Sequence, residues 1–253
     1  MTDFFSPWCD APKDESVGKH TSRVVVSNDD AVGIDTVVDY LPEAYARKEN
    51  LQRIAKRHGK TGVAKLLSDK VPKTKTGRSG DLGEILGTAY VETTLGYTTG
   101  PSRLIERDHQ EWALRGDDVL GIRLNGHEPE LVKVEAKSRA NASKATITAA
   151  REGLRRNDDL ASPHSLTQFA ERLLQHSEAL SDALNDVLQN DGLRPKNLAH
   201  VMFIFAGNHP ISHVRDDLKA YTGDVAQTTV VVRVGAHQDF IAKCYDSVVE
   251  HAP

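Results

Sequence analysis

Two short apolar runs rich in β-forming residues lie in the C-terminal half of the chain, VMFIFA at Val201–Ala206 and TTVVVRV at Thr228–Val234. Runs of this length, rich in β-branched and aromatic residues, are typical of buried strands. Each is followed by a segment with helical periodicity, over Ile211–Tyr221 and His237–His251. This alternation of strands and helices predicts an α/β core with a mixed central sheet flanked by helices.

The spacing of apolar residues predicts further helices over Pro42–His58, Thr61–Leu67, Asp81–Leu95, Ser143–Asn157 and Leu166–Leu188. In the first of these, proline lies in the first turn and Gly59 ends the helix. The last is long and amphipathic, with one apolar stripe that is expected to face the core. The turn-rich segment Val71–Gly80 predicts a loop. We expect the first 35 or so residues to form a loosely organised arm with one short strand, Arg23–Ser27.

The stretch Leu114–Lys137 has the pattern of a β-hairpin, because two extended runs flank the turn sequence Asn-Gly-His-Glu at 125–128. Asn-Gly is a strong signal for a tight turn between strands. Counting outward from a four-residue turn places Asp118 opposite Glu135, and opposed residues point to the same side of a sheet. Lys137 shares that side, because it lies two residues beyond Glu135 on one strand. This register gathers two carboxylates and an ammonium in one patch.

Two facing carboxylates repel each other unless a cation lies between them. Their oxygen atoms are the ligands that Mg²⁺ prefers, and Mn²⁺ is expected to substitute. A metal bound there would acidify a water molecule and stabilise charge on a phosphodiester, and a nearby lysine would orient that water. Glu-x-Lys alone is common in charged proteins, so the prediction depends on its context. A largely apolar strand, LVKV, precedes it, and a basic helix follows.

The charge of the chain is unevenly distributed. Lys and Arg total 32 against 36 Asp and Glu, a net charge of −4, which by itself argues against binding nucleic acid. Between Arg47 and Arg78, however, eleven basic residues accompany only Glu49 and Asp69, for a net +9, so the remainder carries −13. A second basic cluster spans 139–156. Such clusters suit a polyanion, although a solvated helix face is the alternative. The residues predicted to bind DNA are Arg53, Lys56, Arg57, Lys60, Lys73, Lys75, Arg78, Arg139, Lys144, Arg151 and Arg155.

Several features favour a cytoplasmic protein without a membrane span. No apolar stretch reaches the length of a transmembrane helix, and the N-terminus has no signal-peptide pattern. The two cysteines, Cys9 and Cys244, lie at opposite ends of the chain and form no disulfide or metal framework. The phosphate-binding spacing G-x-x-x-x-G-K-[ST] is also missing, so any ATP-driven motor would have to come from another chain.

Gly116-Asp117-Asp118-Val119-Leu120 followed by Glu135-Ala136-Lys137 resembles the active-site signature of the PD-(D/E)xK nucleases. In that superfamily an acidic residue on a preceding helix completes the site, and Glu84 in GDLGEILG takes this place. More narrowly, GDLGE, LRGDDVLGI and VEAKSR resemble the HamA-like nuclease subunits of the Hachiman anti-phage defence system, over residues 79–157. Gly-Asp-Asp stands where the superfamily has Pro-Asp, which leaves Asp117 and Asp118 as alternatives. The pattern and the register favour Asp118.

The resemblance implies a restriction-endonuclease-like core over residues 79–253, preceded at 1–78 by the arm and a basic helical region. It also implies a metal-dependent DNA endonuclease in bacterial anti-phage defence, acting with a helicase subunit. Mg²⁺ would be held by Asp118, Glu135 and the Ala136 carbonyl, with Glu84 as a further ligand and Lys137 as a catalytic residue.

Two alternatives accompany this interpretation. With Asp81 as the N-cap, Glu84 occupies the third helical position, where it would complete a capping box instead of a catalytic site. The whole chain could also be a non-catalytic DNA-binding or adaptor subunit on a nuclease-like fold. Both functions predict DNA binding, and only cleavage distinguishes them.

Overall fold

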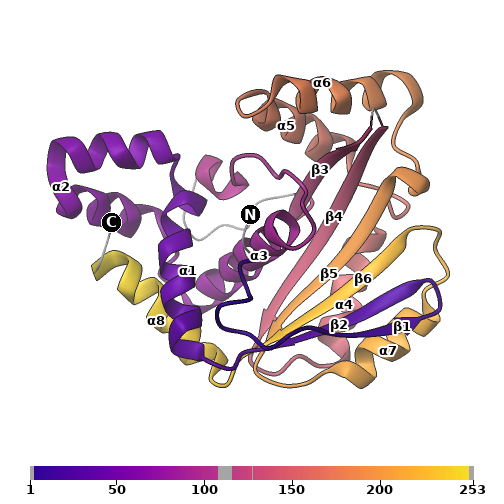
Figure 1. Ribbon diagram of the computed structural model, residues 1–253, viewed down its shortest axis with the longest axis horizontal. Coiled ribbons are helices and arrows are strands. Elements are labelled where there is room, and N and C mark those ends of the chain that lie inside the picture. The colour runs from indigo at the N-terminus through magenta and orange to yellow at the C-terminus, as the bar shows by residue number, and fades with distance from the viewer. Residues whose placement is uncertain (1–2, 108–115, 127, 251–253) are drawn as a thin grey trace.

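The computed structural model describes residues 3–107, 116–126 and 128–250. Its centre is a six-stranded sheet in the order β1-β2-β6-β5-β4-β3 (Figure 1). The four central strands β2, β6, β5 and β4 run parallel to one another, while β1 and β3 pair antiparallel at the two edges. The predicted mixed sheet flanked by helices is confirmed. The strands are Lys13–Val17 (β1), His20–Val26 (β2), Val119–Asn125 (β3), Glu128–Arg139 (β4), Leu198–Ala206 (β5) and Ala226–Arg233 (β6).

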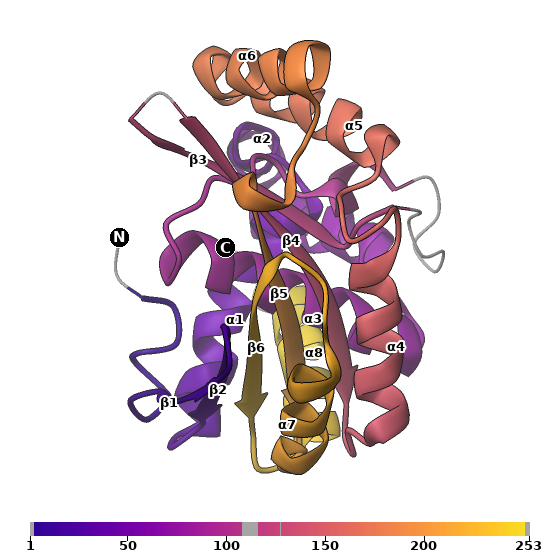
Figure 2. The same cartoon turned by 90° about the vertical axis from the view of Figure 1, so that its right-hand side faces the viewer.

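Helices cover both faces of this sheet (Figure 2). One apolar core joins the sheet to α1, α3 and α8, and a second joins it to α4 and α7. A third core lies between the β3 end of the sheet and α5 with α6. The helices are Asp30–Tyr45 (α1), Lys48–Lys70 (α2), Lys75–Thr93 (α3), Lys144–Arg155 (α4), Pro163–Leu174 (α5), Glu178–Asp186 (α6), Ile211–Ala220 (α7) and His237–Glu250 (α8), with short turns at Arg103–Glu106 (η1), Val187–Asp191 (η2) and Pro195–Asn197 (η3).

The N-terminal segment is packed, so the expectation of a loosely organised arm is wrong. Trp8 is fully buried, and its indole Nε1 donates to the Phe4 carbonyl at 3.0 Å. Strands β1 and β2 form a hairpin whose turn uses Gly18 at φ +62°, and β2 extends the sheet beside β6. A left-handed turn of this kind joins antiparallel strands without strain at glycine.

The first long helix also differs from its prediction. Helix α1 begins at Asp30, where the Asp29 carboxylate caps it by accepting from the N–H groups of Ala31 and Val32 at 3.0 and 3.1 Å. Pro42 therefore lies in its last turn, not in the first turn of a later helix. The predicted break at Gly59 is confirmed. Its φ of +64° divides α2 into two arms, of which the second runs to Lys70.

Helix α3 starts earlier than predicted. Thr74 is its N-cap and accepts from the N–H of Gly77 at 3.1 Å, so the loop predicted over Val71–Gly80 ends at Thr74. Asp81 is consequently buried inside the helix and is not a cap. This placement also rules out the capping-box role for Glu84, which lies in the middle of α3.

The single long helix predicted over Leu166–Leu188 is two helices. The N–H groups of His176 and Ser177 both donate to the Leu173 carbonyl, at 2.8 and 2.6 Å, and this tight turn closes α5. Ser177 then caps α6, and the Ser181 hydroxyl donates back to the Ala170 carbonyl of α5 at 2.9 Å. The apolar stripe continues through both helices, which is why periodicity alone could not reveal the break.

The hairpin register is as predicted, with Leu124 paired to Pro129 and Val119 to Val134. The turn is shorter than expected, because Asn125 and Glu128 already pair. Gly126 lies in it at φ +65°, whereas His127 and the predicted hairpin start at Leu114 fall outside the described residues.

Within the ranges that the structure describes, no helix combines the length and apolar character needed to cross a membrane.

Candidate active site

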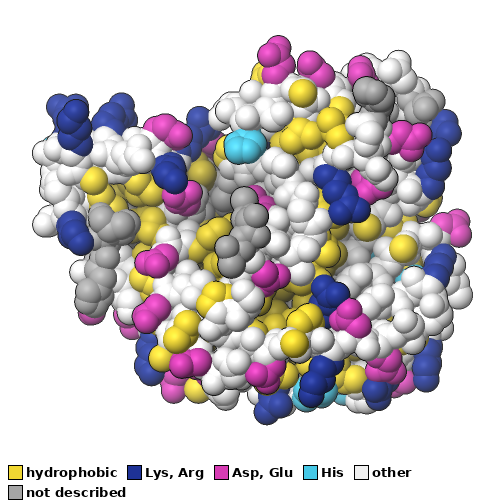
Figure 3. Space-filling view, viewed as in Figure 1, with side chains coloured by type: hydrophobic (Ala, Val, Ile, Leu, Met, Phe, Trp, Pro, Cys, Tyr) yellow, Lys and Arg dark blue, Asp and Glu magenta, His cyan; other side chains and the backbone are white. Residues whose placement is uncertain are grey.

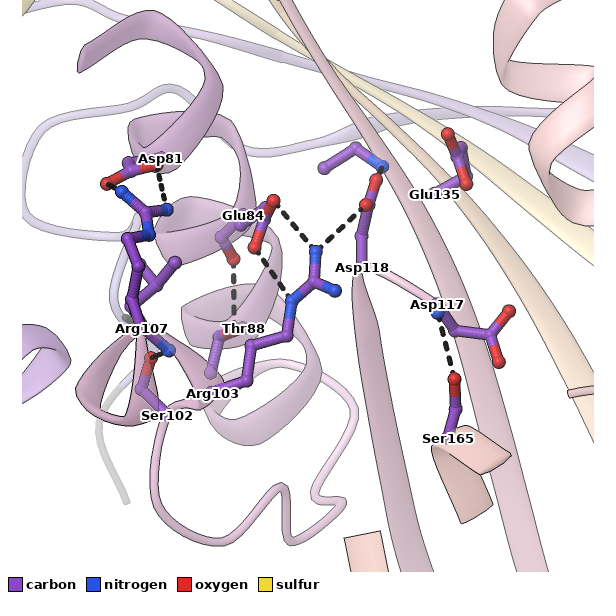
Figure 4. A network of polar contacts seen from close by, with 12 residues as sticks. Asp81, Glu84, Thr88, Ser102, Arg103, Arg107, Asp117, Asp118, Glu135 and Ser165 are labelled. Carbon is purple, nitrogen blue, oxygen red and sulfur yellow. Dashed lines mark hydrogen bonds and ion pairs between the residues drawn. The ribbon is translucent and has the colours of Figure 1, made fainter. Parts of the chain in front are cut away.

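A carboxylate–guanidinium–carboxylate bridge lies between α3 and the start of β3 (Figure 4). Arg103, the first residue of η1, donates from Nε to Glu84 Oε2 at 3.0 Å, and its Nη2 lies 2.9 Å from Glu84 Oε1. The same Nη2 lies 3.1 Å from Asp118 Oδ1. All three side chains are mostly buried, at 13–19% exposure. The two acidic residues assigned to the site from its helix and its first strand are therefore neighbours, and a cation joins them.

Glu135 and Lys137 form the second part of the site, on β4. The Lys137 ammonium donates to Glu135 Oε1 at 2.5 Å. The Glu135 side chain is only 5% exposed and packs against Gly153 of α4, where an added Cβ would overlap the carboxyl group. Glycine at position 153 therefore makes the space that this carboxylate occupies.

Asp118 connects the two parts. Its Oδ2 accepts from the backbone N–H of Ala136, the residue between Glu135 and Lys137, at 2.9 Å. A strand residue directs its N–H and C=O toward the same neighbouring strand, so the Ala136 carbonyl faces the Asp118 side as well. A cation shared by Asp118 and the Ala136 carbonyl would therefore have to lie on this side of β4.

The four predicted residues adjoin one another without forming a closed ligand shell. Among the described residues, no three His, Cys, Asp or Glu side chains come close enough together to hold a metal ion. The available donors, carboxylate oxygens and one carbonyl, are hard ligands that suit Mg²⁺ or Mn²⁺. The position of Arg103 shows directly that positive charge is stable between Glu84 and Asp118. The chemistry of the donors therefore fits a divalent cation, provided that Arg103 vacates this position.

Burial and mutual repulsion both act on the carboxylates of the candidate site. Burial raises the pKa of Glu84, and the negative charge of Asp118 raises it further against the opposing effect of Arg103. Burial likewise raises the pKa of Glu135, and Asp118 again adds to the effect while Lys137 opposes it. Asp118 thus acts on carboxylates of both parts, and a divalent cation would relieve the repulsion among all three.

The neighbouring Asp117 has a different set of partners. Its carboxylate lies 3.3 Å from the fully buried ammonium of Lys133 and accepts from the N–H of Ser162 at 2.9 Å. Its own N–H donates to Ser165 Oγ at 3.1 Å. These contacts fasten the start of β3 to α5. Asp117 is therefore engaged in the core, and Asp118 is the residue that faces the candidate site.

The bridge lines a cleft of about 490 Å³. Tyr40 and Arg47, near the junction of α1 and α2, contribute to one side, and Arg172 of α5 contributes to another. Glu84, Arg103, Asp117 and Asp118 line the cleft, whereas Glu135 and Lys137 lie outside its lining.

The predicted DNA-binding residues have different surroundings. Lys and Arg side chains gather over α2 (Figure 3), and the exposed predicted residues there and elsewhere are Arg53, Lys56, Arg57, Lys60, Lys73, Lys75, Arg139, Lys144 and Arg155. Arg78 pairs with Asp246 at 2.9 Å and lies over the Tyr245 ring.

Arg151 does not fit the prediction. Its guanidinium is buried, donates to Asp217 and Gln227, and lies 3.9 Å from the centre of the Tyr221 ring. An arginine whose donors are satisfied inside the fold is not available to a DNA phosphate, so α4 offers Lys144 and Arg155 in its place.

Sequence reasoning missed three cations around the site: Arg103, Arg107 and Lys133. Arg103 pairs with Glu84 across 19 residues of sequence, and Arg107 pairs with Asp81 across 26. No motif marks such a pairing.

A protein-family model named HamA matches residues 2–248. The chain belongs to the HamA family. The resemblance to HamA-like proteins is thereby confirmed, and it extends over nearly the whole chain instead of residues 79–157 alone. Membership of the HamA family implies a role in Hachiman anti-phage defence. No curated protein matches the chain.

Proposed function

We propose that this HamA-family protein is a metal-dependent DNA endonuclease, the effector of its defence system. The observation that supports this most strongly is the contact between Asp118 and the backbone of Ala136, which joins the acidic residue of one strand to the Glu135-x-Lys137 pair of the next. The carboxylates of Asp118 and Glu135 and the ammonium of Lys137 lie around the Ala136 backbone, and this arrangement is suited to cleaving a phosphodiester.

In this proposal each residue has a separate role. Asp118, Glu135 and the Ala136 carbonyl hold Mg²⁺ or Mn²⁺, and Glu84 is a further ligand. The metal would acidify a water molecule and neutralise charge on the phosphate. Lys137, already hydrogen-bonded to Glu135, would keep its ammonium beside that water and stabilise the negative charge that develops.

We further propose that α2 binds DNA through its phosphates. Its two arms expose Arg53, Lys56, Arg57 and Lys60, and Arg47 and Lys48 at its start reach the cleft. Lysine and arginine contacts to phosphate position a duplex without reading its sequence. A cytoplasmic helicase subunit is the proposed partner, since the sequence has no phosphate-binding loop of its own and an unrestrained nuclease would damage the host chromosome.

The test is cleavage of plasmid and linear DNA with Mg²⁺, with and without the helicase subunit, by wild type, Lys137→Ala and Lys219→Ala. Lys219 is an exposed lysine on α7 and serves as the matched control. We expect cleavage by wild type and Lys219→Ala and its loss in Lys137→Ala. Equal cleavage by wild type and Lys137→Ala would disprove the assignment.

A non-catalytic DNA-binding or adaptor subunit is the second candidate. The position of Arg103 favours it, because this side chain already neutralises two of the proposed metal ligands. This candidate predicts salt-sensitive DNA binding with no cleavage in Mg²⁺ or Mn²⁺, whether or not the helicase subunit is present.

A further inference from the structure

The segment that carries Arg103, residues 102–107, packs beside α1 and reaches α3 through its arginine side chains, and we call it the strap. Ser102 caps its short helix by accepting from the Leu104 N–H at 3.2 Å, and the Leu104 side chain is buried. Arg103 reaches Glu84 and Asp118 from this strap. The strap therefore places its cation by means of a defined local structure.

A second ion pair fastens the strap to the same helix. Arg107 donates from Nη1 and Nη2 to the two oxygens of Asp81 at 2.9 and 2.6 Å, and both side chains are only 6% exposed. Asp81 precedes Glu84 by three residues, so the two carboxylates lie on one face of α3. The Tyr45 hydroxyl also donates to Asp81 at 2.7 Å, which fixes this anchor against α1. Figure 4 shows both arginines directed at α3.

Arg103 and a metal ion would compete for the same oxygens. The guanidinium contacts Glu84 Oε1, Glu84 Oε2 and Asp118 Oδ1, whose lone pairs a divalent cation would need. Two cations within a few ångströms of each other repel, and burial strengthens the repulsion. Arg103 is also incompletely satisfied where it lies. Within the described residues, its buried Nη1 has no hydrogen-bond partner.

We propose that the strap is a built-in inhibitor of metal loading. Arg103 fills the cation position between Glu84 and Asp118, and the metal binds fully only when the strap leaves α3. This inference rests on the proposed nuclease function, because it assumes that these carboxylates are metal ligands. The resting protein then has a low metal affinity, and this affinity rises when the strap detaches from α3.

The test is calorimetric titration of Mn²⁺ into the full chain. Arg103→Ala removes the competing cation, and Arg107→Gln weakens the anchor without changing a proposed ligand. An arginine near a carboxylate changes its affinity for a proton by about 10- to 1,000-fold, so we expect Arg103→Ala to bind Mn²⁺ at least about tenfold tighter than wild type. Arg107→Gln should tighten binding in the same direction by a smaller factor.

Two controls make the result specific. Arg103→Lys keeps the charge and should stay close to wild type. Arg123→Gln removes an arginine that pairs with Glu130 on the exposed hairpin, away from the site, and should leave Mn²⁺ affinity unchanged. Unfolding of each variant, followed by circular dichroism, establishes that it is folded. If Arg103→Ala fails to fold, Arg103→Gln, which removes the charge and keeps a hydrogen-bonding side chain, takes its place in the titration.

The outcomes separate the inference from the function on which it rests. Equal or weaker Mn²⁺ binding by Arg103→Ala, together with Lys137-dependent cleavage by wild type, overturns the inhibitory strap and leaves the nuclease intact. No Mn²⁺ binding by any variant, together with no cleavage, overturns the nuclease and the strap with it. Tighter binding by Arg103→Ala and Arg107→Gln alone among the variants supports the inference.

Discussion

Asp117 and Asp118 are adjacent in the chain, yet replacing each by asparagine should affect a different property of the protein. Asp117 pairs with Lys133, and their side chains are 4% and 0% exposed. Asp118 instead faces Arg103 and the Ala136 N–H beside the cleft. We therefore expect Asp117→Asn to reduce stability and Asp118→Asn to reduce metal binding and cleavage.

The expected size of each effect comes from these contacts. Removing one partner of a buried ion pair destabilises a protein by about 3–5 kcal/mol. The Lys133 ammonium keeps three carbonyl acceptors, Leu154, Arg156 and Leu160 at 2.7–3.1 Å, so about 3 kcal/mol is expected for Asp117→Asn. Asp118→Asn leaves Arg103 paired with Glu84, and its loss of stability should be about 1 kcal/mol. Its loss of Mn²⁺ affinity should be on the order of 100-fold.

Urea unfolding followed by circular dichroism gives the free energy of unfolding of wild type and both variants, and calorimetric titration gives their Mn²⁺ affinities. The double variant Asp117→Asn with Lys133→Met removes both charges and should recover part of the stability lost in Asp117→Asn. If Asp117→Asn were as stable as wild type and bound no Mn²⁺ while Asp118→Asn bound it normally, the assignment of the two aspartates would be reversed.

Three further predictions follow from other parts of the molecule. Gly153→Ala should displace the Glu135 carboxyl group and weaken Mn²⁺ binding about tenfold. The control is Gly80→Ala, whose added methyl meets open space in α3, and it should neither change the Mn²⁺ affinity nor destabilise the fold. Equal Mn²⁺ affinities for the two variants would refute the packing argument. Replacing Arg53, Lys56 and Lys60 by glutamate should weaken DNA binding. It should also reduce the slope of log K against log salt concentration by about 0.9 for each phosphate that the variant no longer neutralises. Fluorescence anisotropy with Lys219→Glu as control measures this slope, and an unchanged slope would exclude α2 from the DNA interface. Burial lowers the pKa of His200 to about 4, so the stability that depends on its neutral form is complete above pH 6.5 and is lost as the pH falls toward 4. Between pH 7 and pH 5 the free energy of unfolding should therefore fall by about 2 kcal/mol less in His200→Gln than in wild type, and parallel pH profiles would contradict this assignment.

Local patterns were sufficient for several features of this protein. The register of the β3–β4 hairpin follows from one turn and a period of two residues, so Glu135, Lys137 and the neighbourhood of Asp118 could be predicted from spacing. The buried strands β5 and β6 followed from short apolar runs. These features depend on residues close together in sequence, where backbone geometry leaves few alternatives.

Helix boundaries and the partners of charged residues required the tertiary structure. Pro42 and Asp81 each suit a helix start by local rules, but both helices start further upstream. Asp29 caps α1, so Pro42 falls in its last turn. Thr74 caps α3, so Asp81 is buried inside it. Arg103 has no pattern around it that indicates a role. Its position between Glu84 and Asp118 arises because separate segments of the chain meet at the edge of the sheet. Ion pairs between distant segments depend on which surfaces the fold brings together, and local propensity contains no information about that.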